Sequence, residues 1–272
     1  MRSALFVSFL LGAFALPAQD REFGTAVAST LTQVRGEPDA FHHVKVQFTV
    51  QFASLGRISN PFFTKFTPSD FANFYVWADE QPIWQEKVYN DPFGMLFLSK
   101  THPKLQQLYE LRLYQRLRVT GVTRNTFQGQ PWIEVTDFEV LDEQLDTAVL
   151  THLHRGERLM EQRLWQRAIA ELSRAPGEGV PEHATRAAYK NLGVCLMRMG
   201  EPQAAISYLE AATGLGGSSD MELANLLAIA RNTPEEALDR TVDVRGLRDS
   251  ERPMWEAFDD DKVRRPSNRL LR

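Results

Sequence analysis

Two pairs of histidines are the first residues in this chain that could do chemistry, because imidazole nitrogens bind transition metals. The pairs are His42-His43 and His152-x-His154. Zinc sites add cysteine or acidic ligands at recognised spacings, and neither pair has such a partner. Adjacent histidines in a strand point to opposite faces, and residues two apart do not share a helix face. We therefore expect no metal site.

Acidic pairs and catalytic motifs lead to a similar expectation. Asp79-Glu80 and Asp137/Glu139 are carboxylate pairs in expected strands or turns, where most such pairs are solvated. The sequence has no Gly-x-Ser-x-Gly, no phosphate-binding glycine loop and no His-Glu-x-x-His motif. We expect a protein that is not an enzyme and needs no cofactor.

Aromatic residues offer a different chemistry, which is stacking against bases, sugars or apolar side chains. They are frequent in the N-terminal half, where the candidate ligand face consists of Phe62, Phe63, Phe66, Trp77, Trp84 and Phe127. The alternative, which we favour, is that these side chains close a small barrel or pack against a second domain.

Alternating apolar residues predict the strands that position these aromatics. Val44 to Phe52 alternates with polar residues, as in a strand with one buried face. Thr101-His102-Pro103 begins a short helix with an apolar face that ends near Leu111. Further strands are expected at 74–77, 92–99, 117–122 and 132–141, with a loop at 125–131 between the last two.

Three strands, a short helix and two strands over residues 41–143 resemble the OB-fold, a five-stranded, partly open barrel. The resemblance implies a ligand face on the second and third strands, between the loops at 57–70 and 124–131. An oligosaccharide or a nucleic-acid strand is the ligand class that this face implies.

The C-terminal half changes to helical spacing. Its segment from Tyr189 to Ala212 reads YKNLGVCLMRMGEPQAAISYLEAA and resembles the tetratricopeptide repeat. Glycine and alanine allow two antiparallel helices to approach closely, and large residues fill the space between them. Gly156 to Ala175 fits the same frame upstream, and Leu223 to Leu238 fits either a degraded third copy or a solvating cap.

By this resemblance, the first helix of each pair forms a concave groove that binds an extended or helical peptide. Candidate groove residues are His152, Arg155, Asn191 and Arg198, whose polar groups could hold a peptide backbone or carboxylate. A solvated helix face is the alternative for each of them.

The first nineteen residues have the layout of a secretory signal peptide, because an apolar stretch follows Met1-Arg2 and ends before Pro17. We expect cleavage, export to the periplasm or the extracellular space, and no membrane span in the mature chain. Cys195 is the only cysteine, so no internal disulfide is possible, and we expect a buried thiol.

The net charge is −4, and both halves carry slightly more acidic than basic residues. Nucleic-acid binders concentrate positive charge, so the balance counts against such partners. We expect an α+β chain in separate domains. They are a signal peptide at 1–19, an OB-like barrel at 20–147, tetratricopeptide-like repeats at 148–242 and a charged, mostly disordered tail at 243–272.

Two functions therefore remain open. The first is an exported scaffold or adaptor whose repeats bind a protein or peptide partner, with the barrel as a second contact or a cap. The second is a ligand-binding barrel that holds an oligosaccharide or nucleic-acid strand, with the repeats used for assembly. The charge balance favours the first function.

Overall fold

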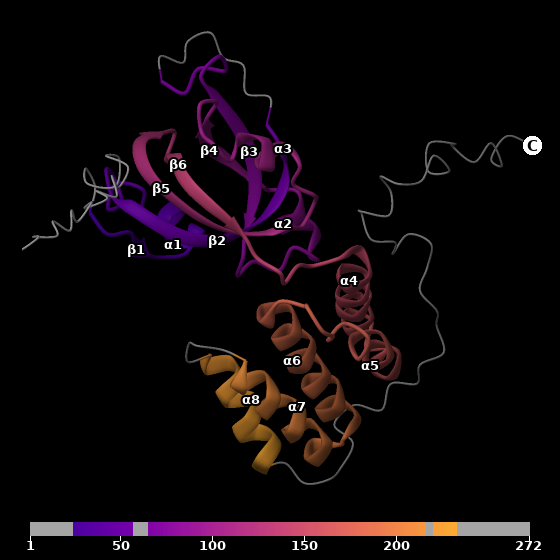
Figure 1. Ribbon diagram of the computed structural model, residues 1–272. Coiled ribbons are helices and arrows are strands. Elements are labelled where there is room, and N and C mark those ends of the chain that lie inside the picture. Colours follow the sequence, from indigo (N-terminus) through magenta and orange to yellow (C-terminus); the bar gives the residue numbers. More distant parts are fainter. Residues whose placement is uncertain (1–23, 57–64, 216–219, 233–272) are drawn as a thin grey trace, which may run out of the picture.

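The computed structural model describes residues 24–56, 65–215 and 220–232, which form a β-barrel followed by helices (Figure 1). The expected signal peptide at 1–19, the tail at 243–272, Phe62, Phe63 and the last part of the degraded repeat copy lie outside the described residues. None of the described helices has the length and apolar character needed to cross a membrane.

Five strands close into the barrel, which confirms the predicted five-stranded architecture. They are β2 (Lys45–Leu55), β3 (Phe71–Ala78), β4 (Phe93–Ser99), β5 (Arg116–Phe127) and β6 (Gln130–Val140). Neighbours follow the order β2-β3-β4-β6-β5, and β5 pairs back with β2. The pairing of β4 with β6 is parallel, and the other pairings around the barrel are antiparallel. A short strand, β1 (Val27–Ala28), pairs in parallel with β2.

The predicted order of three strands, a short helix and two strands is present, with two differences in length. Helix α3 (Leu105–Tyr109) begins later than expected, because His102 Nδ1 accepts the Lys104 N–H at 3.1 Å and closes a turn. The expected loop at 125–131 is mostly strand. Gln128 and Gly129 have φ angles of 51° and 71°, and positive φ at both central residues allows a two-residue hairpin turn.

The barrel core follows the alternation that predicted its first strand. Val46, Phe48, Val50 and Phe52 are all buried and belong to one apolar cluster. Helix α1 (Leu31–Gly36) was not expected; Thr30 caps it with a capping box, and Leu31 and Val34 enter the same cluster. The barrel therefore has its own filled interior.

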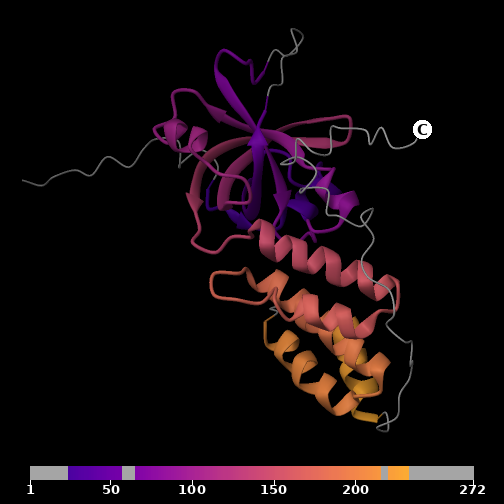
Figure 2. The ribbon, with the colours of Figure 1, turned by 90° about the vertical axis from the view of Figure 1, so that its right-hand side faces the viewer.

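In the part of the chain that the structure describes, the barrel is followed by helices alone. They are α4 (Thr147–Glu161), α5 (Trp165–Leu172), α6 (Glu182–Met199), α7 (Pro202–Gly214) and α8 (Met221–Asn232). Asp146 caps α4 by accepting the Val149 N–H at 2.7 Å. Gly200 ends α6 with a φ of 81°, and Pro202 occupies the first turn of α7. Figure 2 shows α4 running directly beneath the barrel, with the other helices beyond it.

Candidate functional site

Side-chain contacts join helix α6 to α4 on one side and to α8 on the other. Asn191 Nδ2 in α6 donates to Glu157 Oε1 in α4 at 3.4 Å. On its other side, α6 contacts the start of α8 through Lys190 and Glu222, whose Nζ and Oε2 are 2.6 Å apart. We call the surface formed by α4, α6 and α8 the first-helix face.

Asp220 anchors the beginning of α8 to α6. Its carboxylate accepts the Leu223 N–H at 3.2 Å and pairs with Arg186 at 2.8 Å. Partial burial would raise the pKa of Asp220, but the Leu223 N–H and the cations Lys190 and Arg186 outweigh it and lower the pKa. The carboxylate therefore stays ionised and fixes α8 beside α6.

The barrel contacts the first-helix face through the chain between β3 and the short helix α2 (Glu86–Tyr89). Trp84 is 3% exposed, and its indole Nε1 donates to Glu157 Oε1 at 2.7 Å. Gln85 Nε2 donates to the other oxygen of the same carboxylate at 3.0 Å. His154 Nδ1 donates to the Trp84 carbonyl at 2.9 Å, and the ring of His183 stacks on the indole with 6.3 Å between centroids.

Apolar burial extends this contact. Trp84 belongs to a buried cluster that joins side chains from the barrel and from α4, α5 and α6; it includes Trp77, Ile83, Tyr114, Leu145, Leu150, Leu153, Leu172, Ala184 and Leu192. Trp77 is held there by its own hydrogen bond, from Nε1 to the Tyr89 carbonyl at 3.1 Å. The barrel and the helices thus share a continuous buried contact, which we call the junction.

A polar layer lies in the junction. Arg116 in β5 donates through Nε and Nη2 to the two carboxylate oxygens of Asp79, both at 2.7 Å, and it also pairs with Glu143. Burial lowers the pKa of Arg116, but Asp79 and Glu143 more than offset this, so the pKa is raised. Asp79, expected to be solvated, is instead 15% exposed and paired.

His183 at the start of α6 completes this layer. Its Nε2 lies 3.3 Å from Gln51 Nε2 of β2. Burial lowers the pKa of His183, and the positive charge of Arg116 adds to this, although Asp79, Glu80 and Glu143 act in the opposite direction. Among the described residues, Gln51 Oε1 and His183 Nδ1 have no hydrogen-bond partner. The ring is therefore held neutral in a buried site.

The four candidate groove residues fall at different places. Asn191 lies on the first-helix face beside Glu157, whereas His152 Nδ1 lies 2.8 Å from Glu171 Oε2 and so faces α5. Arg155 is half-buried, and Arg198 is exposed near the end of α6. The structure therefore brings Asn191, but not His152, to the contact with the barrel.

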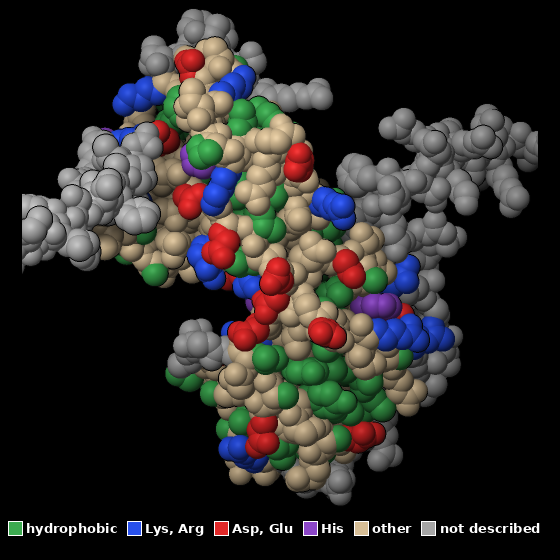
Figure 3. Space-filling view, in the orientation of Figure 1, with side chains coloured by type: hydrophobic (Ala, Val, Ile, Leu, Met, Phe, Trp, Pro, Cys, Tyr) green, Lys and Arg blue, Asp and Glu red, His purple; other side chains and the backbone are tan. Residues whose placement is uncertain are grey.

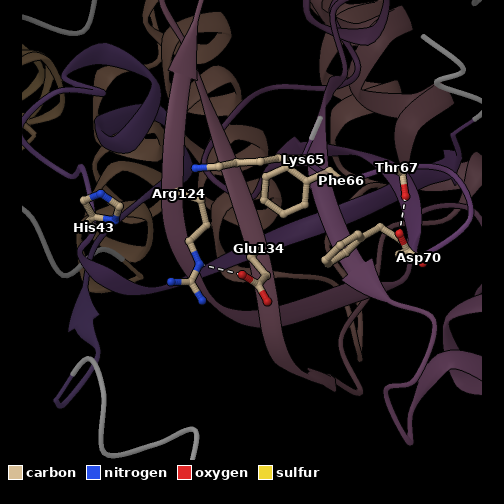
Figure 4. Close-up of a pocket in the computed structure, with 8 residues that line it drawn as sticks. His43, Lys65, Phe66, Thr67, Asp70, Arg124 and Glu134 are labelled. Atoms are coloured by element: carbon tan, nitrogen blue, oxygen red, sulfur yellow. Dashed lines mark hydrogen bonds and ion pairs between the residues drawn. The ribbon is translucent and has the colours of Figure 1, made fainter. Parts of the chain in front are cut away.

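A separate pocket of about 370 Å³ lies on the barrel, away from the junction. Figure 4 shows Arg124 and Glu134 from neighbouring strands facing each other in this pocket, with Nε and Oε2 2.6 Å apart. Its lining comes from both loop regions that the OB-fold resemblance implied and from neighbouring residues; it consists of His43, Lys65, Phe66, Thr67, Asp70, Phe71, Arg124 and Glu134.

The six candidate aromatics separate into two groups. Phe66 lines the pocket, is 6% exposed and stacks on Phe97 at 4.4 Å. Phe127 is 51% exposed and packs edge-on against Trp132 at 5.8 Å. Trp77 and Trp84 are buried in the junction instead, so they offer no free ring face to a ligand at the pocket. Phe62 and Phe63 lie outside the described residues.

Little in the described part of the chain suggests covalent or metal chemistry. No group of three or more His, Cys, Asp and Glu side chains among the described residues is arranged to hold a metal ion. Cys195 is buried, and burial raises the pKa of its thiol to about 12, so little thiolate is present at neutral pH. Asp137 and Glu139 pair with Lys104 and Arg118 at the surface.

Comparisons with known proteins found no matching family model, no matching curated protein and no matching solved structure. The site therefore has to be interpreted from its own geometry. Sequence reasoning missed Glu157, His183 and Gln51, which form the polar contacts of the junction. One signal was present for Glu157, because Leu150, Leu153, His154 and Glu157 have the spacing of a single helix face.

Proposed function

We propose that this protein is an exported, non-enzymatic adaptor that binds a protein partner through α4–α8, with the barrel as a second contact or a cap. The observation that carries the proposal is a repeated close contact between helices. A Cβ atom on Gly156 would lie 2.5 Å from the Leu172 side chain, and one on Gly193 would lie 2.6 Å from that of Leu209. Such approach requires glycine.

The two contacts occupy the same place in successive helix pairs, which supports the resemblance to tetratricopeptide repeats. Stacked pairs of this kind bury a continuous core and leave a surface built mainly from their first helices. Here that surface is the first-helix face. Lys190 and Glu222 pair where α6 meets α8, and the exposed Arg198 lies two turns after Asn191 on the same side of α6. These charges suit a peptide that carries charged groups of both signs.

The charge of the chain and its predicted export indicate the class of partner. The two halves of the chain are slightly acidic, and Figure 3 shows acidic side chains on the visible face where the barrel meets the helices. A protein that binds nucleic acid needs concentrated positive charge to neutralise the phosphates. The N-terminal sequence predicts export, and these features together favour a protein of the cell envelope.

Affinity capture with full-length variants tests this function. The variant Arg198→Glu reverses an exposed charge near the end of α6, and Arg174→Glu, just after α5, is the control, because its side chain is 63% exposed. We expect one or more proteins captured by the wild type and the control to be lost from the Arg198 variant. Equal recovery with all three chains would reject the first-helix face as the binding surface.

A second candidate function rests on the barrel pocket. The strand order, with a parallel β4–β6 pair and a helix between β4 and β5, supports the OB-fold resemblance. The pocket lining balances Lys65 and Arg124 against Asp70 and Glu134. Donors and acceptors of both signs suit the hydroxyl groups of an oligosaccharide better than a phosphate backbone.

Titration of the full chain with neutral oligosaccharides and with single-stranded DNA distinguishes the two ligand classes. Binding of a sugar that is lost in Arg124→Ala, but kept in Arg118→Ala on the outside of the same strand, would favour this second function. Binding of DNA alone would contradict the charge argument.

A further inference from the structure

A segment of the chain itself covers part of the first-helix face. The segment Gln81–Gln85 lies between the end of β3 and α2, and its Trp84 packs on α4 and α6. Under the proposed function, this is the surface on which a partner peptide would lie. The chain's own segment therefore takes the place of such a peptide.

The contacts of this segment are specific rather than generally apolar. The Glu157 carboxylate receives hydrogen bonds from Trp84 and Gln85 of the segment and from Asn191 of α6. His154 fixes the backbone carbonyl of Trp84, and His183 covers its ring. Recognition of a peptide uses the same three kinds of contact: a hydrogen bond to its backbone, a hydrogen bond to a side-chain donor and a site for an aromatic ring.

The contact also includes polar groups that lower the stability of its closed state. Glu157 is a charged group at an interface, and apolar replacements of such groups are often equally stable or more so. Gln51 Oε1 and His183 Nδ1 are buried without a partner among the described residues, and an unsatisfied buried polar atom destabilises the state that buries it. These costs bring the open and closed states closer in free energy.

We infer that the α4–α6 part of the first-helix face recognises an extended protein segment that carries a tryptophan followed by an amide donor, and that Gln81–Gln85 is its internal competitor. The inference rests on the proposed protein-binding function and names the kind of partner. A tethered competitor acts at an effective concentration in about the millimolar range. A partner binds strongly here only when the segment leaves the face.

A labelled peptide with the sequence of residues 79–88, DEQPIWQEKV, tests this in full-length protein. Its fluorescence anisotropy is measured with the wild type and with Trp84→Ala, whose own segment has lost its anchor. We expect the peptide to bind Trp84→Ala about tenfold or more tightly than the wild type. A peptide with alanine in place of tryptophan should show no such gain.

Two further variants serve as controls for the peptide-binding measurement. Trp84→Phe keeps a ring but loses the N–H donor, so it should show a smaller gain even if Trp84→Ala does not fold. Phe127→Ala, at the pocket end of the barrel, should behave as the wild type. Equal binding to all chains, binding of the alanine peptide, or no binding to either Trp84 variant would overturn the inference. The capture experiment above is independent, so loss of this inference alone would leave the adaptor function standing.

Discussion

The indole Nε1 of Trp84 lies 2.7 Å from Oε1 of Glu157, although the two residues are 73 positions apart in the chain. This hydrogen bond links the barrel to the first helix that follows it. Because Glu157 also accepts from Asn191 in α6, one carboxylate connects three parts of the molecule. Its loss should therefore affect both the stability of the junction and the arrangement of α4 and α6.

Replacing Glu157 by alanine should lower the free energy of unfolding. Trp84 Nε1 and Gln85 Nε2 would lose their acceptor, and hydrogen bonds to a charged group contribute about 1.5–3 kcal/mol. Glu161→Ala, one turn later in α4, is the matched control because its pair with Arg158 is exposed and worth about 0–1 kcal/mol. Urea unfolding measures both. Equal losses would show that the Trp84 contact contributes nothing specific.

A second pair of variants tests the polar layer. Arg116→Ala leaves the carboxylate of Asp79, whose side chain is 15% exposed, without its bidentate partner, and we expect a loss of about 3 kcal/mol or more. Arg118→Ala removes a pair with Glu139 in which both side chains are well exposed, so the loss should be about 0.5 kcal/mol. Thermal unfolding of the two variants would contradict this if the Arg118 variant were the less stable.

The neutral state of His183 predicts a dependence on pH. Its pKa in the folded chain is lowered from the ordinary value of 6.5, so below that value the unfolded chain binds the extra proton first. Stability should therefore fall as the pH drops through about 6.5 towards the lowered pKa. Asp220, whose pKa is lowered from 3.8, would lose its contribution only in more acidic solution.

His183→Gln is the comparison for this effect, because glutamine stays uncharged. Urea unfolding at about pH 7.5 and about pH 5.5 should show a smaller loss of stability in this variant than in the wild type. An unchanged pH dependence would mean that His183 does not titrate in this range, or that its ring is already charged in the folded chain.

The close helix contacts give a fourth prediction. Gly193→Ala places a methyl group 2.6 Å from the Leu209 side chain, and overpacking of this kind costs about 1–3 kcal/mol. For Gly214→Ala in α7, the new methyl group would meet no other part of the described residues within 4 Å, so its better helix propensity should leave stability unchanged or raise it by up to about 1 kcal/mol. Calorimetry of the two variants should therefore give opposite signs, and a gain for Gly193→Ala would remove the packing argument.

The sequence predicted the barrel better than it predicted the junction. Alternation from Val44 to Phe52 and the proline-containing start at Thr101 depend on neighbours in the chain, so the strand and helix order could be derived. The sequence predicts a longer loop than the two-residue turn at Gln128-Gly129, because glutamine rarely adopts the positive φ that it has here. Alternation and turn residues in the sequence do not show at which residue a strand ends.

The sequence does not predict at which end of the barrel each aromatic side chain packs. Trp77 and Phe66 both lie near expected loops, yet Trp77 enters the junction and Phe66 lines the pocket at the other end of β3. The difference depends on which end of the barrel meets the helices. That choice depends on contacts such as Trp84 with Glu157 and Gln51 with His183, between residues far apart in the chain.

Site-specific photo-crosslinking in the producing cells shows whether a partner protein binds the first-helix face. A photo-reactive amino acid replaces Arg198 on that face in one full-length chain, and Ser207, exposed on α7, in another. We expect a discrete protein adduct at position 198 and none at position 207. No adduct at 198, or the same adducts at both positions, would contradict it.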